Sequence, residues 1–283
     1  MKRLLVSGGT GFIGSHFLRL ALAKGHEVWA LRRPGSETRI ALDSSPHWID
    51  GCLADLPTRL SQGRAPKCDV FVHFAAVGLQ PATASWEACF RTNVMESLAA
   101  WRAALEQGVR RLVICGSCFE YGASGERYQF IPTSAPLMPT GPYHASKAAA
   151  SMAAIGLAEE REIECAVLRP FHVFGDGQDP SCLWPSLRAA ALTGDDFPMT
   201  LGEQVRDFVP VEDAVSRFLF VACENTLTPG APEIHNIGSG SATRIIDFAE
   251  RWWRHWNARG QLRPGAIDYR RNEVMRYVPE VSP

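Results

Sequence analysis

Three features are missing from this 283-residue sequence: an excess of charge of one sign, an apolar run long enough to cross a membrane, and an internal repeat. Its 29 lysines and arginines balance 30 acidic residues, so the formal net charge is −1. Such a chain has no basic field for nucleic acid or for an anionic membrane surface. The first predicted strand begins at residue 2, so we expect no secretory leader. We therefore expect a cytoplasmic protein without a nucleic-acid or membrane partner.

A disulfide framework and a metal site are also missing from the pattern. The eight cysteines are scattered, and we expect them to be reduced thiols. One close pair exists, Cys115 and Cys118, in the order Cys-Gly-Ser-Cys. It follows the buried-strand pattern 111–114, whereas a reactive cysteine pair is typical of a helix N-terminus. No set of cysteine and histidine has zinc spacing, so no metal is expected.

The sequence does have a glycine turn close to its start. Residues 2–7 have the pattern of a buried strand and 15–25 that of an amphipathic helix. The turn between them runs Gly8-Gly9-Thr10-Gly11-Phe12-Ile13-Gly14. There, Gly8 allows a tight turn, Gly11 lets the backbone approach a pyrophosphate, and Gly14 lets the helix pack close to the strand. The spacing differs from the standard Gly-x-Gly-x-x-Gly, and an ordinary tight turn is the alternative. The flanks favour a dinucleotide site that includes Phe12 and Ile13.

The end of the second predicted strand, 26–31, indicates which dinucleotide is bound. NAD-binding units place an acidic residue about 20 positions after the glycines, where it binds the ribose 2′-hydroxyl. This sequence has Arg32 and Arg33 there. Two guanidinium groups suit a 2′-phosphate and offer no acceptor to a hydroxyl. We expect NADP, with NAD possible; a solvated strand end is the alternative.

Strand and helix patterns alternate over most of the chain, which predicts an α/β fold with a doubly wound parallel sheet. The apolar run 70–76 is typical of a central parallel strand. It ends in Ala75 and Ala76, which are small enough for a cofactor to lie against. We expect residues 1–175 to form a Rossmann domain that binds NAD(P). Residues 176–283 are mainly a small C-terminal substrate lobe, with 206–223 returning to the Rossmann domain.

A second group of residues has the chemistry of an acid–base site. Tyr143 and Lys147 are four apart on a predicted helix, so they share one face. A nearby ammonium favours the phenolate, and we expect Lys147 to lower the pKa of Tyr143 into the range of acid–base work. Ser117 follows a parallel strand, at the sheet edge where the cofactor binds, and its hydroxyl can hold a substrate oxygen. Asn93 lies on a helix predicted over 84–107.

These pieces, in this order, resemble the extended short-chain dehydrogenase/reductases, the nucleotide-sugar epimerase, dehydratase and reductase group. The matching segments cover nearly the whole chain: the glycine turn, Val72–Ala76, Asn93-Val94, Ser117 with Tyr121-Gly122, Tyr143-x-x-x-Lys147, Leu168-Arg169-Pro170, Val173-Phe174-Gly175 and Arg206–Val209.

The resemblance implies a role for each site residue. Tyr143 would be the acid–base, Lys147 would hold the nicotinamide ribose and tune Tyr143, and Ser117 would bind the reacting oxygen. Asn93 resembles the family's relay or helix-kink asparagine; a helix-surface amide is the alternative.

The resemblance also implies the residues that bind the nucleotide sugar. Arg206 and Arg271 resemble two arginines that contact its diphosphate, with solvated arginines as the alternative. His172 stands where many members have asparagine; it would contact substrate or would simply be packed. Dehydratases carry an Asp-Glu pair after the serine or threonine, and this chain has Cys118 and Phe119 there.

Because Cys118 and Phe119 cannot remove water from a sugar, we expect reduction rather than dehydration. The expected enzyme uses NADPH to reduce the 4-keto group of a nucleoside-diphosphate 4-keto-6-deoxyhexose. One alternative is a nucleotide-sugar epimerase that retains NAD. Another is a non-catalytic nucleotide-sensing protein on the same fold. The helices at 84–107 and 143–161 are a candidate homodimer face, or are buried within one subunit.

Overall fold

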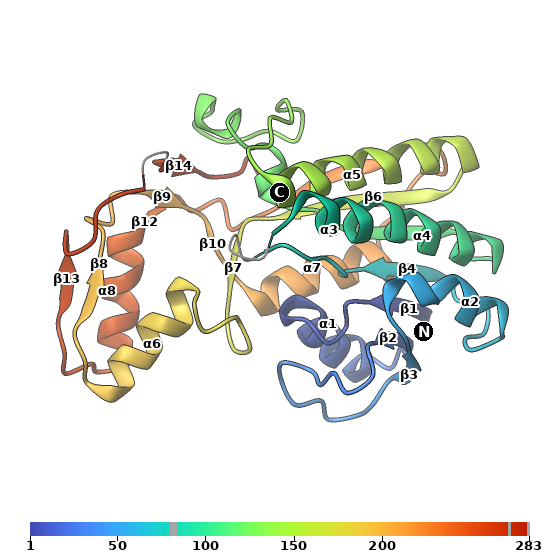
Figure 1. The fold of residues 1–283 in the computed structure, drawn as a ribbon, viewed down its shortest axis with the longest axis horizontal. Coiled ribbons are helices and arrows are strands. Elements are labelled where there is room, and N and C mark those ends of the chain that lie inside the picture. Colours follow the sequence, from blue (N-terminus) through green and yellow to red (C-terminus); the bar gives the residue numbers. More distant parts are fainter. Residues whose placement is uncertain (80–83, 271–272, 282–283) are drawn as a thin grey trace.

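The computed structural model describes residues 1–79, 84–270 and 273–281, which form a sheet domain and a smaller lobe beside it (Figure 1). Seven strands, all parallel, form the central sheet in the order β11-β6-β5-β4-β1-β2-β3. Their bounds are β1 Arg3–Ser7, β2 Glu27–Arg32, β3 His47–Asp50, β4 Val70–His73, β5 Arg111–Cys115, β6 Glu164–Pro170 and β11 Glu233–Ile237. The predicted doubly wound α/β fold is confirmed.

Side chains alternate along buried strands, so both faces of this sheet are apolar, and helices cover both of them. In β1, Leu4 and Val6 enter one core and Leu5 enters the opposite one. On the first face lie α1 (Phe12–Ala23) and α7 (Val211–Cys223). On the second lie α2 (Leu56–Ser61), α3 (Trp86–Phe90), α4 (Ser97–Glu106) and α5 (Pro142–Arg161) (Figure 1). None of the helices in the described ranges is long and apolar enough to span a membrane.

The lobe is built on short strands and aromatic helices. Trp253 packs in its core, beside a second cluster of Phe174, Trp184 and Phe248. The lobe contains α6 Leu183–Thr193, β8 Phe197–Met199, β9 Val205–Arg206, β12 Thr243–Arg244, α8 Ile245–His255, β13 Leu262–Pro264 and β14 Arg276–Tyr277, and it is joined to the sheet domain by β7 His172–Phe174 and β10 Phe208–Pro210. The division of the chain at residue 175 stays a prediction. Two elements that follow residue 175 belong to the sheet domain: α7 packs on its first face, and β11 pairs with β6.

The strand order reverses at β1, whose neighbours are β2 on one side and β4 on the other. In open α/β sheets, ligands bind beyond the carboxyl ends of the strands at such a reversal. The glycine turn follows β1 at this edge, and Ala75 and Ala76 follow β4 there.

Candidate active site

The glycine turn is shaped by its neighbours as well as by its own backbone. Gly8 has φ +72°, and a Cβ there would lie 2.5 Å from the Ala75 nitrogen. A Cβ on Gly14 would lie 2.1 Å from the Gly8 carbonyl oxygen, which enforces the close helix–strand contact. Gly11 precedes α1, and no side chain caps this helix. Its first N–H groups, including those of Phe12 and Ile13, therefore suit an anion such as a pyrophosphate.

Arg32 ends β2 at this same edge, but it does not stand alone. Its Nε donates to Asp50 Oδ1 at 2.8 Å, and its guanidinium carbon lies 4.9 Å from the centre of the Trp48 ring. Arg33 is exposed. The cofactor role of both arginines stays a prediction.

Ser117, Tyr143 and Lys147 are brought together by the loop after β5 and the first turns of α5. Pro142 occupies the first turn of α5, where its missing N–H costs nothing. The Ser117 side chain lies close enough to the Tyr143 phenol to act on its pKa, and its hydroxyl accepts the Phe119 N–H at 3.2 Å. Lys147 is buried one turn further along α5, and its Nζ donates to the Cys115 carbonyl at 2.6 Å. The three predicted catalytic side chains thus share one site.

The expected effect of Lys147 on Tyr143 is wrong for this arrangement. Burial, with the nearby Cys115 thiol as a smaller cause, raises the pKa of Tyr143 rather than lowering it. The spacing of Tyr143 and Lys147 predicted that they share a helix face. It could not show that the Lys147 ammonium donates to the Cys115 carbonyl. At neutral pH the phenol therefore carries its proton, which suits a proton donor.

Asn93 lies in a helix that is not continuous over 84–107 as predicted. A π-helical turn, Arg91–Glu96, separates α3 from α4 and contains Asn93. The Asn93 side chain accepts the Val77 N–H at 2.8 Å, and its Nδ2 donates to the Val77 carbonyl and to Ser146 Oγ. These bonds match the helix-kink interpretation. Asn93 joins the loop after β4 to α5, and its relay role stays a prediction.

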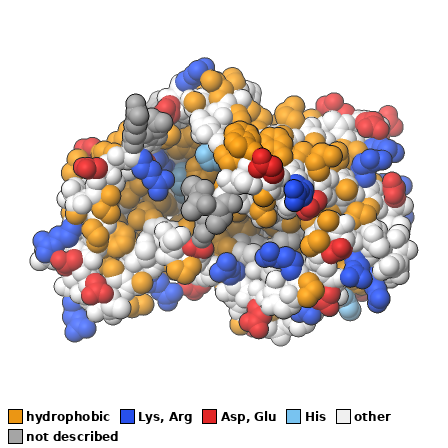
Figure 2. Space-filling view, in the orientation of Figure 1, with side chains coloured by type: hydrophobic (Ala, Val, Ile, Leu, Met, Phe, Trp, Pro, Cys, Tyr) orange, Lys and Arg blue, Asp and Glu red, His pale blue; other side chains and the backbone are white. Residues whose placement is uncertain are grey.

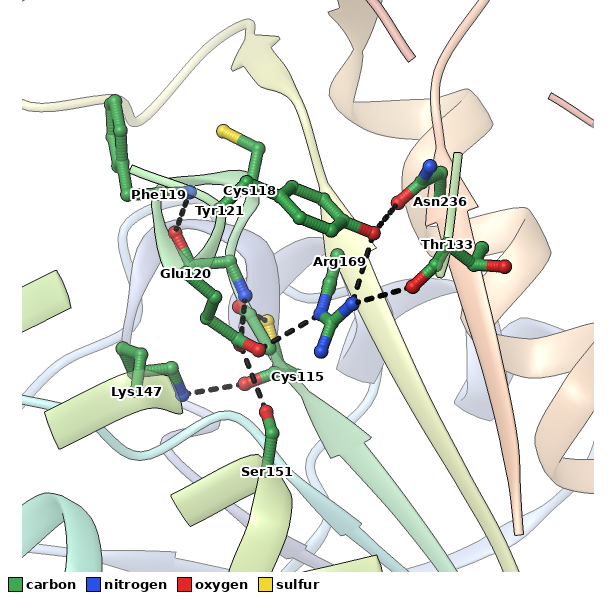
Figure 3. A network of polar contacts seen from close by, with 12 residues as sticks. Cys115, Cys118, Phe119, Glu120, Tyr121, Thr133, Lys147, Ser151, Arg169 and Asn236 are labelled. Atoms are coloured by element: carbon green, nitrogen blue, oxygen red, sulfur yellow. Dashed lines mark hydrogen bonds and ion pairs between the residues drawn. The ribbon is translucent and has the colours of Figure 1, made fainter. Parts of the chain in front are cut away.

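Glu120 is an organising residue of this site that the sequence analysis missed. Its Oε1 accepts the Ser117 N–H at 2.8 Å and the Ser151 hydroxyl at 2.9 Å, and its Oε2 accepts Arg169 Nε at 2.8 Å (Figure 3). Arg169 in turn donates to the Tyr121 hydroxyl at 2.9 Å. Both ion-pair side chains are at most 1% exposed. One sequence signal existed: Ser-x-x-Glu, here Ser117 to Glu120, is a capping box, and it forms here.

The lobe side of the site contains His172 and Arg206. His172 begins β7 among the rings of Phe119, Phe208 and Tyr277, and its buried Nδ1 has no hydrogen-bond partner in the described part of the chain. This contact set is that of a packed histidine, and a substrate contact stays a prediction.

The structure places Arg206 in a different contact from the one expected. Arg206 is buried, and its guanidinium pairs with Glu273 at 3.1 Å and donates to the Val274 carbonyl. It therefore binds the C-terminal segment here, and a diphosphate contact stays a prediction. Arg271 lies outside the described residues.

The buried His73 and the half-buried His172 should make the protein less stable as the pH falls. Burial is the main cause that lowers the pKa of His73 and of His172 to about 3. His73 is held neutral between the Ser7 hydroxyl at 2.7 Å and the Ser97 hydroxyl at 3.1 Å. An unfolded histidine titrates near pH 6.5, so between about pH 6.5 and 3 the unfolded state binds more protons and stability falls with pH.

We expect His73 and His172 each to remove about 2 kcal/mol of unfolding free energy between pH 7.5 and pH 5. Urea unfolding at the two pH values measures the fall. His172→Asn should reduce this fall by about 2 kcal/mol, because the variant has one imidazole of lowered pKa fewer. The exposed His255→Asn is the matched control and should leave the fall unchanged. An equal fall in wild type and His172→Asn would contradict the prediction.

Comparison with known proteins agrees with this geometry. Residues 4–238 match the NAD-dependent epimerase/dehydratase family. The chain belongs to this family. Within it, a UDP-glucose 4-epimerase of Lactobacillus helveticus is 26% identical over 88% of this chain and 80% of the relative. A dTDP-glucose 4,6-dehydratase of Streptomyces antibioticus is 29% identical over 84% of this chain and 72% of the relative.

Solved structures of this family have the same fold. A dTDP-glucose 4,6-dehydratase of Streptomyces venezuelae with NAD bound superposes with a TM-score of 0.80 at 26% identity, over 98% of this chain and 88% of that one. A UDP-glucose 4-epimerase of Thermotoga maritima, with UDP-glucose, gives a TM-score of 0.84 at 23% identity, over 99% and 90% of the two chains. Family membership makes this chain an enzyme of an NAD-dependent nucleotide-sugar group. The glycine cradle and the uncapped α1 fit such a dinucleotide.

Proposed function

We propose that this enzyme uses NADPH to reduce the 4-keto group of a nucleoside-diphosphate 4-keto-6-deoxyhexose. One observation carries the proposal: the set Ser117, Tyr143 and Lys147 is complete, while Cys118 and Phe119 stand where dehydration needs carboxylates. The carboxylate nearest in sequence, Glu120, is buried and paired with Arg169. It is committed to structure and is not a free acid–base group.

The chain's own residues suit the reduction of a carbonyl. When bound, NADPH supplies the hydride that reduces the carbonyl carbon. Tyr143 donates its proton to the carbonyl oxygen, which becomes the hydroxyl. Ser117 uses its oxygen to accept the Phe119 N–H, so its own proton is left to donate to the substrate oxygen. The Lys147 ammonium, one turn further along α5, then stabilises the negative phenolate that Tyr143 becomes once it has given up its proton.

The surroundings of Ser117 also suit a 6-deoxy sugar. The Phe119 ring is 40% exposed and stacks on His144, with 4.8 Å between the ring centres. Burial lowers the pKa of His144, which disfavours a charge on this wall. A methyl group packs against such a wall at no cost, whereas a carboxylate there would lose hydration without gaining a partner.

The test supplies the purified enzyme with NADPH and a nucleoside-diphosphate 4-keto-6-deoxyhexose. The consumption of NADPH is measured as the loss of absorbance of its reduced nicotinamide. We expect NADPH to be consumed stoichiometrically with the sugar, and NADH to be used much more slowly. The proposal fails if NADPH is not consumed or if NADH works far better.

An epimerase with retained NAD is the second candidate, and the UDP-glucose 4-epimerases among the relatives favour it. The same three residues would remove and return a proton at one sugar hydroxyl. Protein that copurifies with NAD, and that interconverts a UDP-sugar with no net change in NADPH, would support this candidate instead.

We also propose a homodimer through the helical segments 84–107 and 143–161, which contain α3, the π-helical turn, α4 and α5. Hydrophobic side chains gather over this face (Figure 2), where Trp86 is 55% exposed, Met95 63% and Met152 55%. An exposed apolar face of this kind is typical of an interaction site. Sedimentation velocity should give twice the chain mass, and Met152→Glu should give the monomer. A monomeric wild type at micromolar concentration would contradict this.

A further inference from the structure

Arg32 is held by two neighbours at the edge of the sheet where the cofactor is expected. Strands β2 and β3 pair so that Arg32 lies directly beside Asp50. Arg32 Nε donates to Asp50 Oδ1 at 2.8 Å, while Trp48, two residues before Asp50, lies under the guanidinium at 4.9 Å. The two side chains of the ion pair are 34% and 57% exposed, so water and ligands reach them.

The contact with Asp50 uses one part of the guanidinium and leaves another open. A guanidinium has five N–H donors in a planar fork, and a phosphate is best bound by two of them in parallel. Asp50 takes the Nε donor, so the hydrogen bonds at the described residues leave the two Nη groups of Arg32 without a protein partner. The Trp48 ring lies beneath the guanidinium carbon and gives the fork one packed face.

We propose that Asp50 and Trp48 are positioning residues that hold Arg32 as a preformed fork for the 2′-phosphate of NADP. This inference rests on the proposed use of NADP and adds the residues that create the preference. An arginine held in one rotamer loses little freedom when it binds, and this raises its affinity for the phosphate. Arg33 is exposed beside it and lacks this support, so it adds positive charge but little direction.

Two replacements of Asp50 separate orientation from charge. Asp50→Asn keeps an oxygen that accepts from Nε and removes the negative charge. Asp50→Ala removes both. If Asp50 orients Arg32, only the alanine variant weakens binding. If Asp50 mainly neutralises Arg32, both variants tighten it.

The experiment measures the affinity of the whole protein for adenosine 2′,5′-bisphosphate and for AMP by calorimetry. These probes differ only in the 2′-phosphate and carry no nicotinamide, so no turnover is needed. We expect Asp50→Ala and Trp48→Leu each to weaken the bisphosphate about 5- to 10-fold and AMP less than 2-fold, which is the scale of a lost preorganised contact. Asp50→Asn should stay within 2-fold of wild type or bind more tightly. Glu27→Ala removes an exposed partner of Arg3 at the opposite end of β2 and should change neither affinity.

The Arg32→Ala variant distinguishes failure of this inference from failure of the NADP assignment. If Arg32→Ala weakens the bisphosphate and Asp50→Ala does not, the NADP assignment stands and the positioning inference is overturned. If Arg32→Ala has no effect, both are overturned. Two other results also overturn the positioning inference. If Asp50→Ala binds the bisphosphate more tightly, Asp50 repels the phosphate. If both Asp50 variants lose affinity for AMP equally, Asp50 contacts the ribose itself.

Discussion

Replacing Tyr143 by phenylalanine is expected to lower kcat for keto-sugar reduction by about 10²- to 10⁴-fold, the range that one positioned acid–base group contributes. The phenylalanine ring keeps the packing of the first turn of α5 and removes only the hydroxyl. The alkoxide that forms on the sugar would then have to take its proton from water. Affinity for the dinucleotide and for the nucleotide sugar should change less than 2-fold, because the hydroxyl acts on the transition state.

Steady-state kinetics and separate binding measurements check this prediction together. Tyr128→Phe is the matched control, since it removes a hydroxyl from a tyrosine packed at the edge of the apolar core. It should leave kcat within 2-fold of wild type. Unchanged turnover in Tyr143→Phe would remove Tyr143 from the chemistry. Intact binding combined with no turnover in the wild type would favour a nucleotide sensor.

Local pattern was enough to predict most of the fold and the central part of the site. Buried parallel strands are continuous apolar runs, and a glycine turn between such a strand and a helix is typical of a dinucleotide site. Tyr143 and Lys147 could be predicted to share a helix face because four residues make about one turn. Each of these inferences needs only neighbours in sequence.

The contacts that sequence analysis missed join distant residues. Glu120 and Arg169 are 49 positions apart, and Arg206 meets Glu273 from 67 positions away. Spacing along the chain carries no signal for such pairs. The π-helical turn at Asn93 depends on the Val77 loop, and the raised pKa of Tyr143 depends on burial, so neither could be predicted from a helical pattern.

Replacing Glu120 by alanine is expected to lower the free energy of unfolding by about 3–5 kcal/mol, because Arg169 would be left charged and buried without its partner. Burial raises the pKa of Glu120, while Arg169 is the main opposing influence that favours the carboxylate. The backbone N–H of Ser117 would also lose its acceptor, so kcat should fall as well. Urea unfolding and steady-state kinetics measure the two effects.

Three further variants test whether the buried charge is the cause. Glu120→Gln keeps an oxygen that accepts the Ser117 N–H but presents its NH2 group, a donor, to Arg169. Because it keeps the side-chain volume and one hydrogen bond, its loss of stability should be smaller than that of Glu120→Ala, and it can be measured even if Glu120→Ala fails to fold. Arg244→Ala removes an ion pair that is 56% and 45% exposed, and should cost at most about 1 kcal/mol. The double variant Glu120→Leu with Arg169→Met should be more stable than Glu120→Ala, since it leaves no unpaired charge. If Glu120→Ala cost no more unfolding free energy than Arg244→Ala, the buried Glu120–Arg169 pair would not be the source of the stability.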